Sequence, residues 1–291
     1  MEEARNYKTE YAAFLRQYPY QTIAVDGVKV RYQYGGKEGA PVLLFFHGLE
    51  MQEMWMPYAK HFSKDYRFLI YEYPLHTVKP DEQMAFAFHL LQALGIQRVI
   101  LIGASDGGVH AQVFAKNYPQ AVQGMVIFTT LTIDSDYVRN IKKEGLKGPI
   151  MVAVLRLLPA KTEMNLLLKK APGFLSCETP ENQAYGMTFY ETVAADLHYK
   201  ERFIHSTRCV SQLKDYPVFT PEDFAYLRGK IQVLLPEQDM FKKEDQQRLA
   251  ALFRQVDAEI LDVPGGHVGF VVQAEAYLEK IERFLPRCID A

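Results

Sequence analysis

Short apolar runs alternate with amphipathic stretches along most of this 291-residue chain, and this alternation constrains the fold more than any other feature. A continuous apolar run of this length predicts a strand that is buried on both faces, as in parallel sheets. Strands that alternate with helices predict a parallel sheet covered on both faces, with right-handed crossovers. The predicted strands cover residues 41–48, 66–74, 97–103, 122–130, 230–239 and 257–266, and the predicted helices cover 81–95, 107–119, 243–255 and 273–285.

Two segments depart from this regular pattern. Residues 22–36 hold two β-like runs around Asp26-Gly27, which predicts an antiparallel hairpin. Residues 131–216 show helical periodicity without a convincing buried strand, and they are far longer than the usual connection in an α/β fold. We therefore expect an α/β core from residues 1–130 and 217–291, with a mostly parallel, doubly wound sheet, and a helical cap insertion at 131–216. The alternative is that some of these helices simply pack on the core.

The composition is that of an ordinary globular protein, with 48% hydrophobic and 23% charged residues. The formal net charge of -2 gives no basic surface for nucleic acid. The three cysteines stand at irregular spacing, which predicts neither disulfides nor a zinc site, and reduced thiols fit a cytoplasmic protein. The stretch 1–20 carries acidic side chains and no uninterrupted apolar segment, so we expect no secretory signal.

The best candidate for a membrane contact is the apolar stretch at residues 148–160. It is too short to span a bilayer and contains Arg156, so we expect no stable membrane insertion. Its flanks are basic, which leaves open a contact with a lipid surface or a homodimer interface. A packed cap helix with one solvated face is the default expectation.

The sequence VILIGASDGGVH at residues 99–110 passes from an apolar run into a helix-like stretch through the pattern G-x-S-x-G. A nucleophile elbow requires this pattern between a buried strand and a helix. Small residues flank a sharp turn, and the helix directs its N-terminal N–H groups at the bond under attack. The pentapeptide alone is a weak signal, so its position carries the argument. Ser105 is the predicted nucleophile, and a small residue in a tight turn is the alternative.

A serine hydroxyl needs a base, and the base needs an acid that orients it. Of the eight histidines, His267 follows the last apolar run in a glycine-flanked loop, from which it could reach Ser105. Asp239 ends the preceding apolar run. The carboxyl ends of parallel strands meet at one edge of a sheet, so we expect Ser105, Asp239 and His267 to meet there. Their chain order is the nucleophile–acid–base order of this elbow.

An acyl-transfer site also needs hydrogen-bond donors for the developing oxyanion. We expect them to be the backbone N–H of Asp106, directly after the nucleophile, and that of Leu49, in the loop after the run at 41–46. His47 in the same loop is expected to hydrogen-bond the loop backbone rather than to take part in the chemistry.

Together these motifs resemble the α/β-hydrolase superfamily, in its serine-nucleophile, esterase-like branch with a helical cap. The resemblance covers the hairpin, the elbow and the three loops described above, and thus nearly the whole chain outside 131–216. Trp55 also stands where many relatives carry an aromatic residue. The resemblance implies Ser105 as nucleophile, His267 as base, Asp239 as acid, and the amides of Leu49 and Asp106 as oxyanion donors.

Two stretches depart from the pattern of these relatives. The acid commonly stands in a Gly-x-x-Asp turn, whereas this chain has Pro236-Glu237-Gln238-Asp239, which leaves Glu237 as a lesser candidate. Some relatives take the acid from the end of the sixth strand, which would make it Asp134 or Asp136. Residues 71–80, YEYPLHTVKP, replace a common glycine-containing loop, so we expect an unusual pocket rim.

The expected reaction is a two-step acyl transfer, most simply the hydrolysis of small to medium apolar carboxylic esters by a carboxylesterase-like enzyme. The same groups would serve an aminopeptidase, a carbon–carbon bond hydrolase, a thioesterase or a perhydrolase, and Glu50 and Glu53 could hold the amine terminus of a peptide. Serine at the elbow argues against the dehalogenase and epoxide-hydrolase branches, in which the resemblance would require a carboxylate nucleophile. A non-enzymatic receptor or scaffold on the same fold is the remaining alternative.

The expected partner is a small-molecule substrate, without a metal or cofactor. The sequence has no H-E-x-x-H, no cysteine pair at ligand spacing and no glycine-rich nucleotide motif. Apolar residues of the cap could line an acyl pocket, although we expect most of them to bury the cap against the core. They are Met151, Leu155, Leu158, Met164, Leu166, Phe174, Met187 and Phe189.

Overall fold

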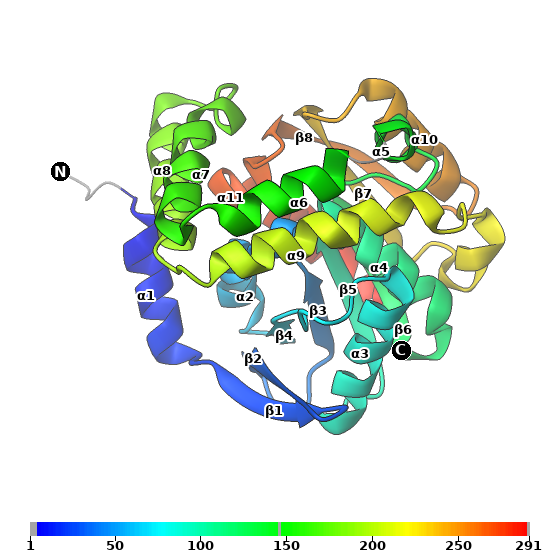
Figure 1. Ribbon diagram of the computed structural model, residues 1–291. Coiled ribbons are helices and arrows are strands. Elements are labelled where there is room, and N and C mark those ends of the chain that lie inside the picture. The colour runs from blue at the N-terminus through cyan, green and yellow to red at the C-terminus, as the bar shows by residue number, and fades with distance from the viewer. Residues whose placement is uncertain (1–4, 145–146, 290–291) are drawn as a thin grey trace.

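The computed structural model describes residues 5–144 and 147–289. Its centre is an eight-stranded sheet with the order β1-β2-β4-β3-β5-β6-β7-β8 (Figure 1). Strand β2 pairs antiparallel with β1 and with β4, and all pairs from β4 to β8 are parallel. The predicted hairpin and the mostly parallel sheet are thus confirmed. The strands are β1 (Gln21–Val25), β2 (Val28–Gly36), β3 (Val42–Phe46), β4 (Arg67–Tyr71), β5 (Val99–Ala104), β6 (Val122–Phe128), β7 (Ile231–Gln238) and β8 (Glu259–Gly266).

Helices cover both faces of the sheet, as the alternating pattern predicts. Successive residues of β3 enter different hydrophobic clusters: Leu43 and Phe45 belong to one, and Leu44 and Phe46 to the other. The sheet is therefore doubly wound, with a core on each side. The first cluster contains side chains of α2 (Met56–Phe62), α11 (Gly269–Val272) and α12 (Ala274–Phe284), and the second contains side chains of α3 (Pro80–Ala93), α4 (Asp106–Asn117) and α10 (Lys243–Arg254).

An N-terminal helix, α1 (Tyr7–Gln17), joins the first cluster without having been predicted. Asn6 caps it, because its side chain accepts a hydrogen bond from a backbone N–H of the first turn at 3.1 Å. The buried side chains are spaced i, i+4 and i+7, which places them on one face of the helix. They are Tyr7, Tyr11 and Phe14.

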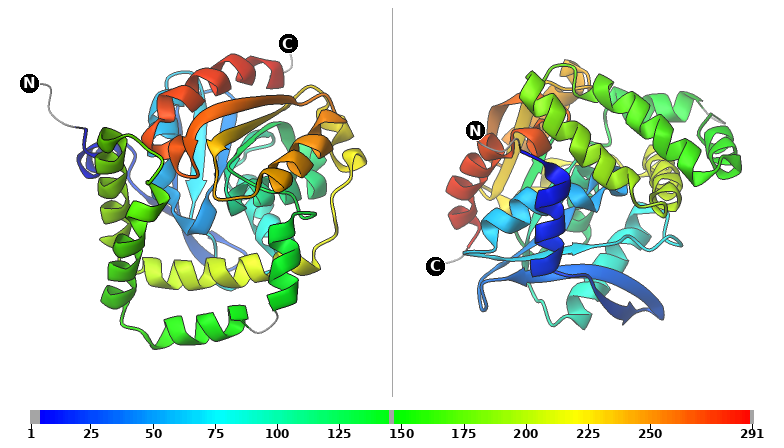
Figure 2. Two further views of the ribbon diagram at one scale, coloured as in Figure 1. Left: turned by 90° about the horizontal axis from the view of Figure 1, so that it is seen from above. Right: turned by 90° about the vertical axis from the view of Figure 1, so that its left-hand side faces the viewer.

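The described residues between 131 and 216 form α-helices and no strand. The helices are α5 (Asp136–Glu144), α6 (Lys147–Leu157), α7 (Ala160–Phe174), α8 (Pro180–Ala194) and α9 (Tyr199–Gln212). Figure 2 shows α6 and α9 lying beyond the ends of the central strands, on the side to which the arrows point. The division of the chain into a core and a cap insertion stays a prediction.

Within residues 5–144 and 147–289, none of the helices is both long and apolar enough to cross a membrane. Helix α6, which contains most of the apolar stretch at 148–160, has 11 residues. Its side chains Ile150, Val154 and Leu157 are exposed. Because they are spaced i, i+4 and i+7, they lie on one face of α6.

Glycines allow α4 to approach β3 and β5 closely. A Cβ atom at Gly107 would stand 2.1 Å from the carbonyl oxygen of Phe46, and one at Gly103 would stand 2.6 Å from the carbonyl oxygen of Gly107. Both distances are shorter than real carbon–oxygen contacts, and both obstructing atoms belong to the backbone. The glycines of the elbow are therefore required by the packing of α4 on the sheet.

We expect Gly107→Ala to lower the free energy of unfolding by about 3 kcal/mol, because the new methyl group would force the backbones of β3 and α4 apart. The control is Gly173→Ala in α7, where a Cβ atom would meet nothing within 4 Å. Alanine is the better helix former, so this variant should be at least as stable as the wild type. Urea denaturation followed by circular dichroism compares the three proteins. Equal midpoints for both variants would contradict the packing argument.

Candidate active site

Ser105 lies between β5 and α4 with φ 56° and ψ -130°. Positive φ strains a residue that has a side chain, and it persists only where the surroundings hold the backbone in place. Here the Thr130 hydroxyl donates to the Ser105 carbonyl oxygen at 2.5 Å, and the Ser105 N–H donates to the Phe128 carbonyl oxygen at 3.3 Å. The turn has the sharp strand-to-helix form that the sequence pattern predicts.

The structure brings Ser105, His267 and Asp239 into one hydrogen-bonded chain. Asp239 follows β7 and His267 follows β8, so both stand at the carboxyl ends of neighbouring parallel strands. His267 Nε2 lies 3.1 Å from Ser105 Oγ, and His267 Nδ1 lies 2.7 Å from Asp239 Oδ1. When Nδ1 donates to the carboxylate, Nε2 can accept the proton of the hydroxyl. The geometry suits a nucleophile, a base and an orienting acid.

The surroundings of Asp239 and His267 differ in their access to solvent. The side chain of Asp239 is 1% exposed, whereas that of His267 is 14% exposed. Asp239 Oδ1 also accepts the Phe241 N–H at 3.2 Å, and the Phe241 ring packs edge-on against His267. Asp239 Oδ2 is buried without a partner among the described residues. A buried carboxylate with so few donors would be stabilised by a positive charge on His267.

The other acids considered from the sequence lie elsewhere. Glu237 is exposed, and Asp134 and Asp136 form ion pairs with arginines. Of these candidates, the structure places Asp239 on His267. Its catalytic role stays a prediction.

The amides expected to bind an oxyanion are occupied by a side chain. The Leu49 N–H donates to Asp106 Oδ1 at 2.8 Å, and the Asp106 carboxyl also accepts from its own backbone N–H. Burial raises the pKa of Asp106 to about 6, while these amides and the nearby His267 oppose the rise. The sequence argument considered only the backbone of Asp106 and missed this contact. The signal available was an acid directly after the serine of the elbow.

Helix α9 holds the Leu49 loop from the opposite side (Figure 1). The Tyr199 hydroxyl donates to the Leu49 carbonyl oxygen at 3.1 Å, and Arg202 donates to the Glu50 carbonyl oxygen at 3.1 Å. Leu49 and Glu50 both have positive φ, 47° and 54°, so the loop depends on such support. The sequence argument did not identify these α9 residues, whose spacing on one helix face was the available signal.

Glu50 and Glu53, considered as ligands for an amine, are buried and have partners on α9. Glu50 pairs with His205 through a short hydrogen bond, and Glu53 lies 3.1 Å from Arg202. Burial raises the pKa of Glu50 to about 7, and His205 and Arg202 oppose this rise. Both carboxylates therefore contribute to the contact between the Leu49 loop and α9.

The expectation for His47 was wrong in its detail. The backbone N–H of His47, not its ring, donates to the Tyr73 hydroxyl, at 3.0 Å. The ring stacks on Tyr73 with 4.1 Å between centroids, and its Nδ1 has no partner among the described residues. Burial lowers the pKa of His47 well below its ordinary value. The ring is therefore neutral and serves in packing.

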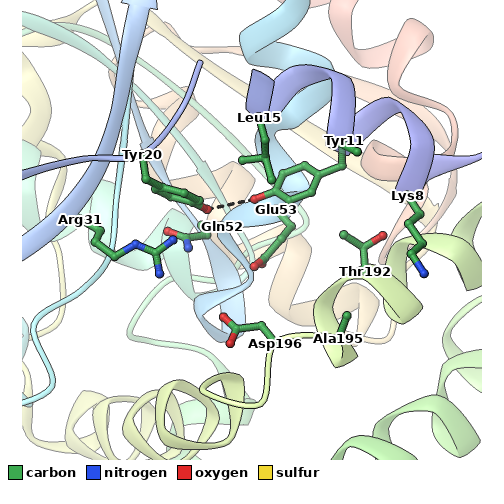
Figure 3. A pocket seen from close by; sticks show the side chains of 11 residues that line it. Lys8, Tyr11, Leu15, Tyr20, Arg31, Gln52, Glu53, Thr192, Ala195 and Asp196 are labelled. Carbon is green, nitrogen blue, oxygen red and sulfur yellow. Dashed lines mark hydrogen bonds between the residues drawn. The ribbon is translucent and has the colours of Figure 1, made fainter. Parts of the chain in front are cut away.

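A separate cavity of about 330 Å³ lies between α1, β2, α8 and the 3₁₀ helix η2 (Gln52–Trp55), as Figure 3 shows. Its wall includes Tyr11 and Tyr20, whose hydroxyls are 2.9 Å apart. Ser105, Asp239 and His267 are not among its lining residues. The cavity is therefore distinct from the candidate active site.

Among the described residues, one buried group of side chains could offer ligand atoms to a metal: Glu50, His205 and Cys209, within 4.8 Å of one another. Both ring nitrogens of His205 already have partners, Glu50 at Nδ1 and the Thr77 carbonyl oxygen at Nε2. Burial raises the pKa of the Cys209 thiol, which disfavours the thiolate that a metal would need. We interpret the group as part of the hydrogen-bonded contact between α9 and the Leu49 loop.

A model of the alpha/beta hydrolase family matches residues 43–280 of this chain. The matched segment contains the elbow, the Leu49 loop and the loops of Asp239 and His267. The chain belongs to the alpha/beta hydrolase family. Hydrolysis is thus the class of reaction that its family indicates.

Two curated members of the alpha/beta hydrolase comparison are human. Monoacylglycerol lipase ABHD6 is 24% identical over 228 residues, which are 65% of this chain and 67% of that protein. Epoxide hydrolase 4 is 27% identical over 142 residues, 44% of this chain and 39% of that protein, so the match spans about two fifths of that relative. A thermophilic esterase from Thermogutta terrifontis shares the fold, with a TM-score of 0.67, 16% identity, and coverage of 92% of this chain and 98% of that one.

The raised pKa of Asp106, about 6, means that the folded protein holds this proton more tightly than the unfolded chain. Folding therefore loses stability as the pH rises from about 4 to about 6. Asp106→Asn keeps an oxygen acceptor for the Leu49 N–H without the charge. We expect it to raise the free energy of unfolding by about 2 kcal/mol at pH 8 and to change it little at pH 4.

Urea denaturation at the two pH values measures this difference. The matched control is Asp245→Asn, because the Asp245 carboxylate is buried and accepts the Asp136 N–H at 2.6 Å, outside the candidate site. Asp245 also pairs with Arg248, so its replacement should lower the stability at pH 8. If both variants lost stability at pH 8, the raised pKa of Asp106 would not explain its energetics.

Proposed function

We propose that this member of the alpha/beta hydrolase family is a serine hydrolase that works through an acyl-enzyme, with small to medium apolar carboxylic esters as substrates. The observation that supports this most is the chain of hydrogen bonds from Ser105 Oγ through His267 to the buried Asp239. These three groups have the types and the order that a nucleophile, a general base and an orienting acid need.

In the first step, Ser105 Oγ attacks the ester carbonyl carbon while His267 Nε2 takes the hydroxyl proton. Asp239 keeps the Nδ1–H of His267 in place and stabilises the imidazolium that forms. The tetrahedral intermediate places its negative oxygen near the amides of Leu49 and Asp106, and the imidazolium protonates the departing alcohol. In the second step, His267 deprotonates a water molecule, which attacks the acyl-serine and releases the carboxylic acid.

An ester substrate has more support than an epoxide. The epoxide-hydrolase branch requires a carboxylate as the nucleophile of the elbow, and Ser105 occupies that position here. The neighbouring carboxylate, Asp106, is engaged by the Leu49 N–H. The names of monoacylglycerol lipase ABHD6 and of the Thermogutta esterase also support ester chemistry.

The aminopeptidase alternative has less support, because Glu50 and Glu53 both have partners on α9. A carbon–carbon bond hydrolase, a thioesterase and a perhydrolase would use the same three residues. A receptor or scaffold would leave Ser105 unreactive. The experiments below separate these classes.

The cap residues considered for an acyl pocket differ in their burial. Met164 and Phe189 are buried in the first hydrophobic cluster, and Phe174 and Met187 pack against it. Met151 and Leu166 are exposed. A contact with a lipid surface or a second copy of the chain at the exposed face of α6 remains a proposal, as does a cytoplasmic location.

A fluorophosphonate probe tests the nucleophile. We expect mass spectrometry to find the label on Ser105, and to find none in Ser105→Ala or His267→Ala, because the activated hydroxyl is the reacting group. The serine of another elbow position is absent here, so Ser206→Ala, which removes a hydroxyl near Asp106, is a suitable comparison and should retain labelling at Ser105. A folded wild-type protein without label would overturn the enzymatic proposal.

The identity of the acid is tested by comparing Asp239→Asn with Asp134→Asn. Replacing the orienting acid leaves His267 in the wrong tautomer, so we expect Asp239→Asn to lower kcat by about 10⁴-fold. Asp134, which pairs with Arg139, should be replaceable with little change. A series of p-nitrophenyl esters of increasing acyl length measures both effects and sizes the pocket. Equal activities in the two variants would refute the assignment of Asp239.

A further inference from the structure

The carboxylate of Asp106 stands where the proposed reaction needs hydrogen-bond donors for an oxyanion. Its Oδ1 lies 2.8 Å from the Leu49 nitrogen, and the carboxyl also accepts the N–H of Asp106 itself. A carboxylate oxygen on these two amides has the negative charge of the oxyanion that they would bind during acyl transfer. The resting site is thus filled by the chain's own side chain.

We propose that Asp106 keeps the oxyanion site occupied and thereby excludes carboxylate anions, the products that ester hydrolysis releases, while a neutral ester carbonyl displaces it. This inference rests on the proposed serine-hydrolase function. It makes Asp106 a specificity-determining residue, which discriminates between the neutral substrate and the anionic product of the same acyl group. No bond to Asp106 forms or breaks in this role.

The loop around Asp106 leaves room for its carboxylate. A Cβ atom at Gly48 would stand 3.0 Å from Asp106 Oδ1 and 2.6 Å from Ser105 Cβ. Any larger residue at Gly48 would therefore press on both the carboxylate and the proposed nucleophile. The absence of a side chain at this position lets the elbow, the loop and the carboxylate meet.

A displaced carboxylate has a partner close by. Asp106 Oδ2 lies 3.5 Å from the Ser206 hydroxyl of α9, so a small rotation of the side chain would exchange the Leu49 N–H for this hydroxyl. The exchange removes a charged hydrogen bond from the amides, which a neutral carbonyl can replace. A product carboxylate would have to enter beside Asp106, and two negative charges a few ångströms apart repel each other.

Several titratable groups act on Asp106 from the surrounding elements. His267, after β8, favours its ionised form, whereas burial opposes ionisation. Glu50 in the Leu49 loop, Cys209 on α9 and Tyr73 after β4 are also coupled to its charge. The ionised form is the one that excludes anions, so the exclusion should weaken as the pH falls below about 6.

Isothermal titration calorimetry with butyrate tests the proposal without relying on turnover. At pH 7.5 we expect Asp106→Ala to bind butyrate about tenfold more tightly than the wild type, because repulsion by a nearby carboxylate is removed. Asp106→Asn keeps a neutral acceptor and should bind with intermediate affinity. Asp245→Asn, which changes a buried carboxylate outside the site, should bind like the wild type.

The charge is tested by the pH dependence and by product inhibition. The ratio of butyrate affinities between Asp106→Ala and the wild type should fall toward one at pH 5.5, because the wild-type carboxyl then takes up its proton. With p-nitrophenyl butyrate as substrate, added butyrate should inhibit Asp106→Ala at about tenfold lower concentration than the wild type.

The outcomes separate this inference from the proposed function. If the wild type hydrolyses esters but Asp106→Ala binds butyrate no better, the role of Asp106 is overturned and the serine-hydrolase proposal stands. If Asp106→Ala gains butyrate affinity while neither protein hydrolyses esters or reacts with the fluorophosphonate, the anion exclusion stands and the proposed function is overturned. Failure of both measurements overturns both.

Discussion

The positive φ of Ser105 is the constraint on which the candidate site depends. Strain of this kind costs on the order of 1–3 kcal/mol and must be offset by the surrounding structure. The offset comes from the fold itself: Gly107 lets α4 press against β3, and Thr130 at the end of β6 holds the Ser105 carbonyl oxygen. Because the turn is sharp, Ser105 Oγ stands at the sheet edge where the loop after β8 brings His267 within 3.1 Å.

The second dependence runs from α9 to the Leu49 loop. Two successive residues of this loop, Leu49 and Glu50, have positive φ, and their carbonyl oxygens accept hydrogen bonds from Tyr199 and Arg202. The position of a predicted oxyanion donor is therefore set by a helix that follows it by about 150 residues. A shift of α9 would move the Leu49 amide, so substrate entry beneath the helix and oxyanion binding are coupled through these contacts.

The sequence was sufficient to predict the sheet and the meeting of Ser105, Asp239 and His267, because continuous apolar runs identify buried strands and parallel strands end at one edge. Helix α1 was missed although Tyr7, Tyr11 and Phe14 carry its periodicity. The contact of Asp106 with Leu49 could not be predicted in the same way. It joins residues 57 positions apart, and it depends on a side-chain rotamer and a loop conformation that no local pattern determines.

The occupied oxyanion site reflects a conflict between stability and catalysis. Two amides directed at an empty position are useful in the transition state, since preoriented donors need no reorganisation. In the resting protein the same amides would lose a hydrogen bond wherever water is excluded, which costs about 1–3 kcal/mol per group. Asp106 satisfies them, but burial raises the pKa of its carboxyl, so the remedy carries an electrostatic cost of its own. A neutral acceptor at this position would avoid that cost, yet it would bring no negative charge against the acid that hydrolysis releases. The charge of Asp106 is thus the property that separates an occupant selected for stability from one that also selects the ligand.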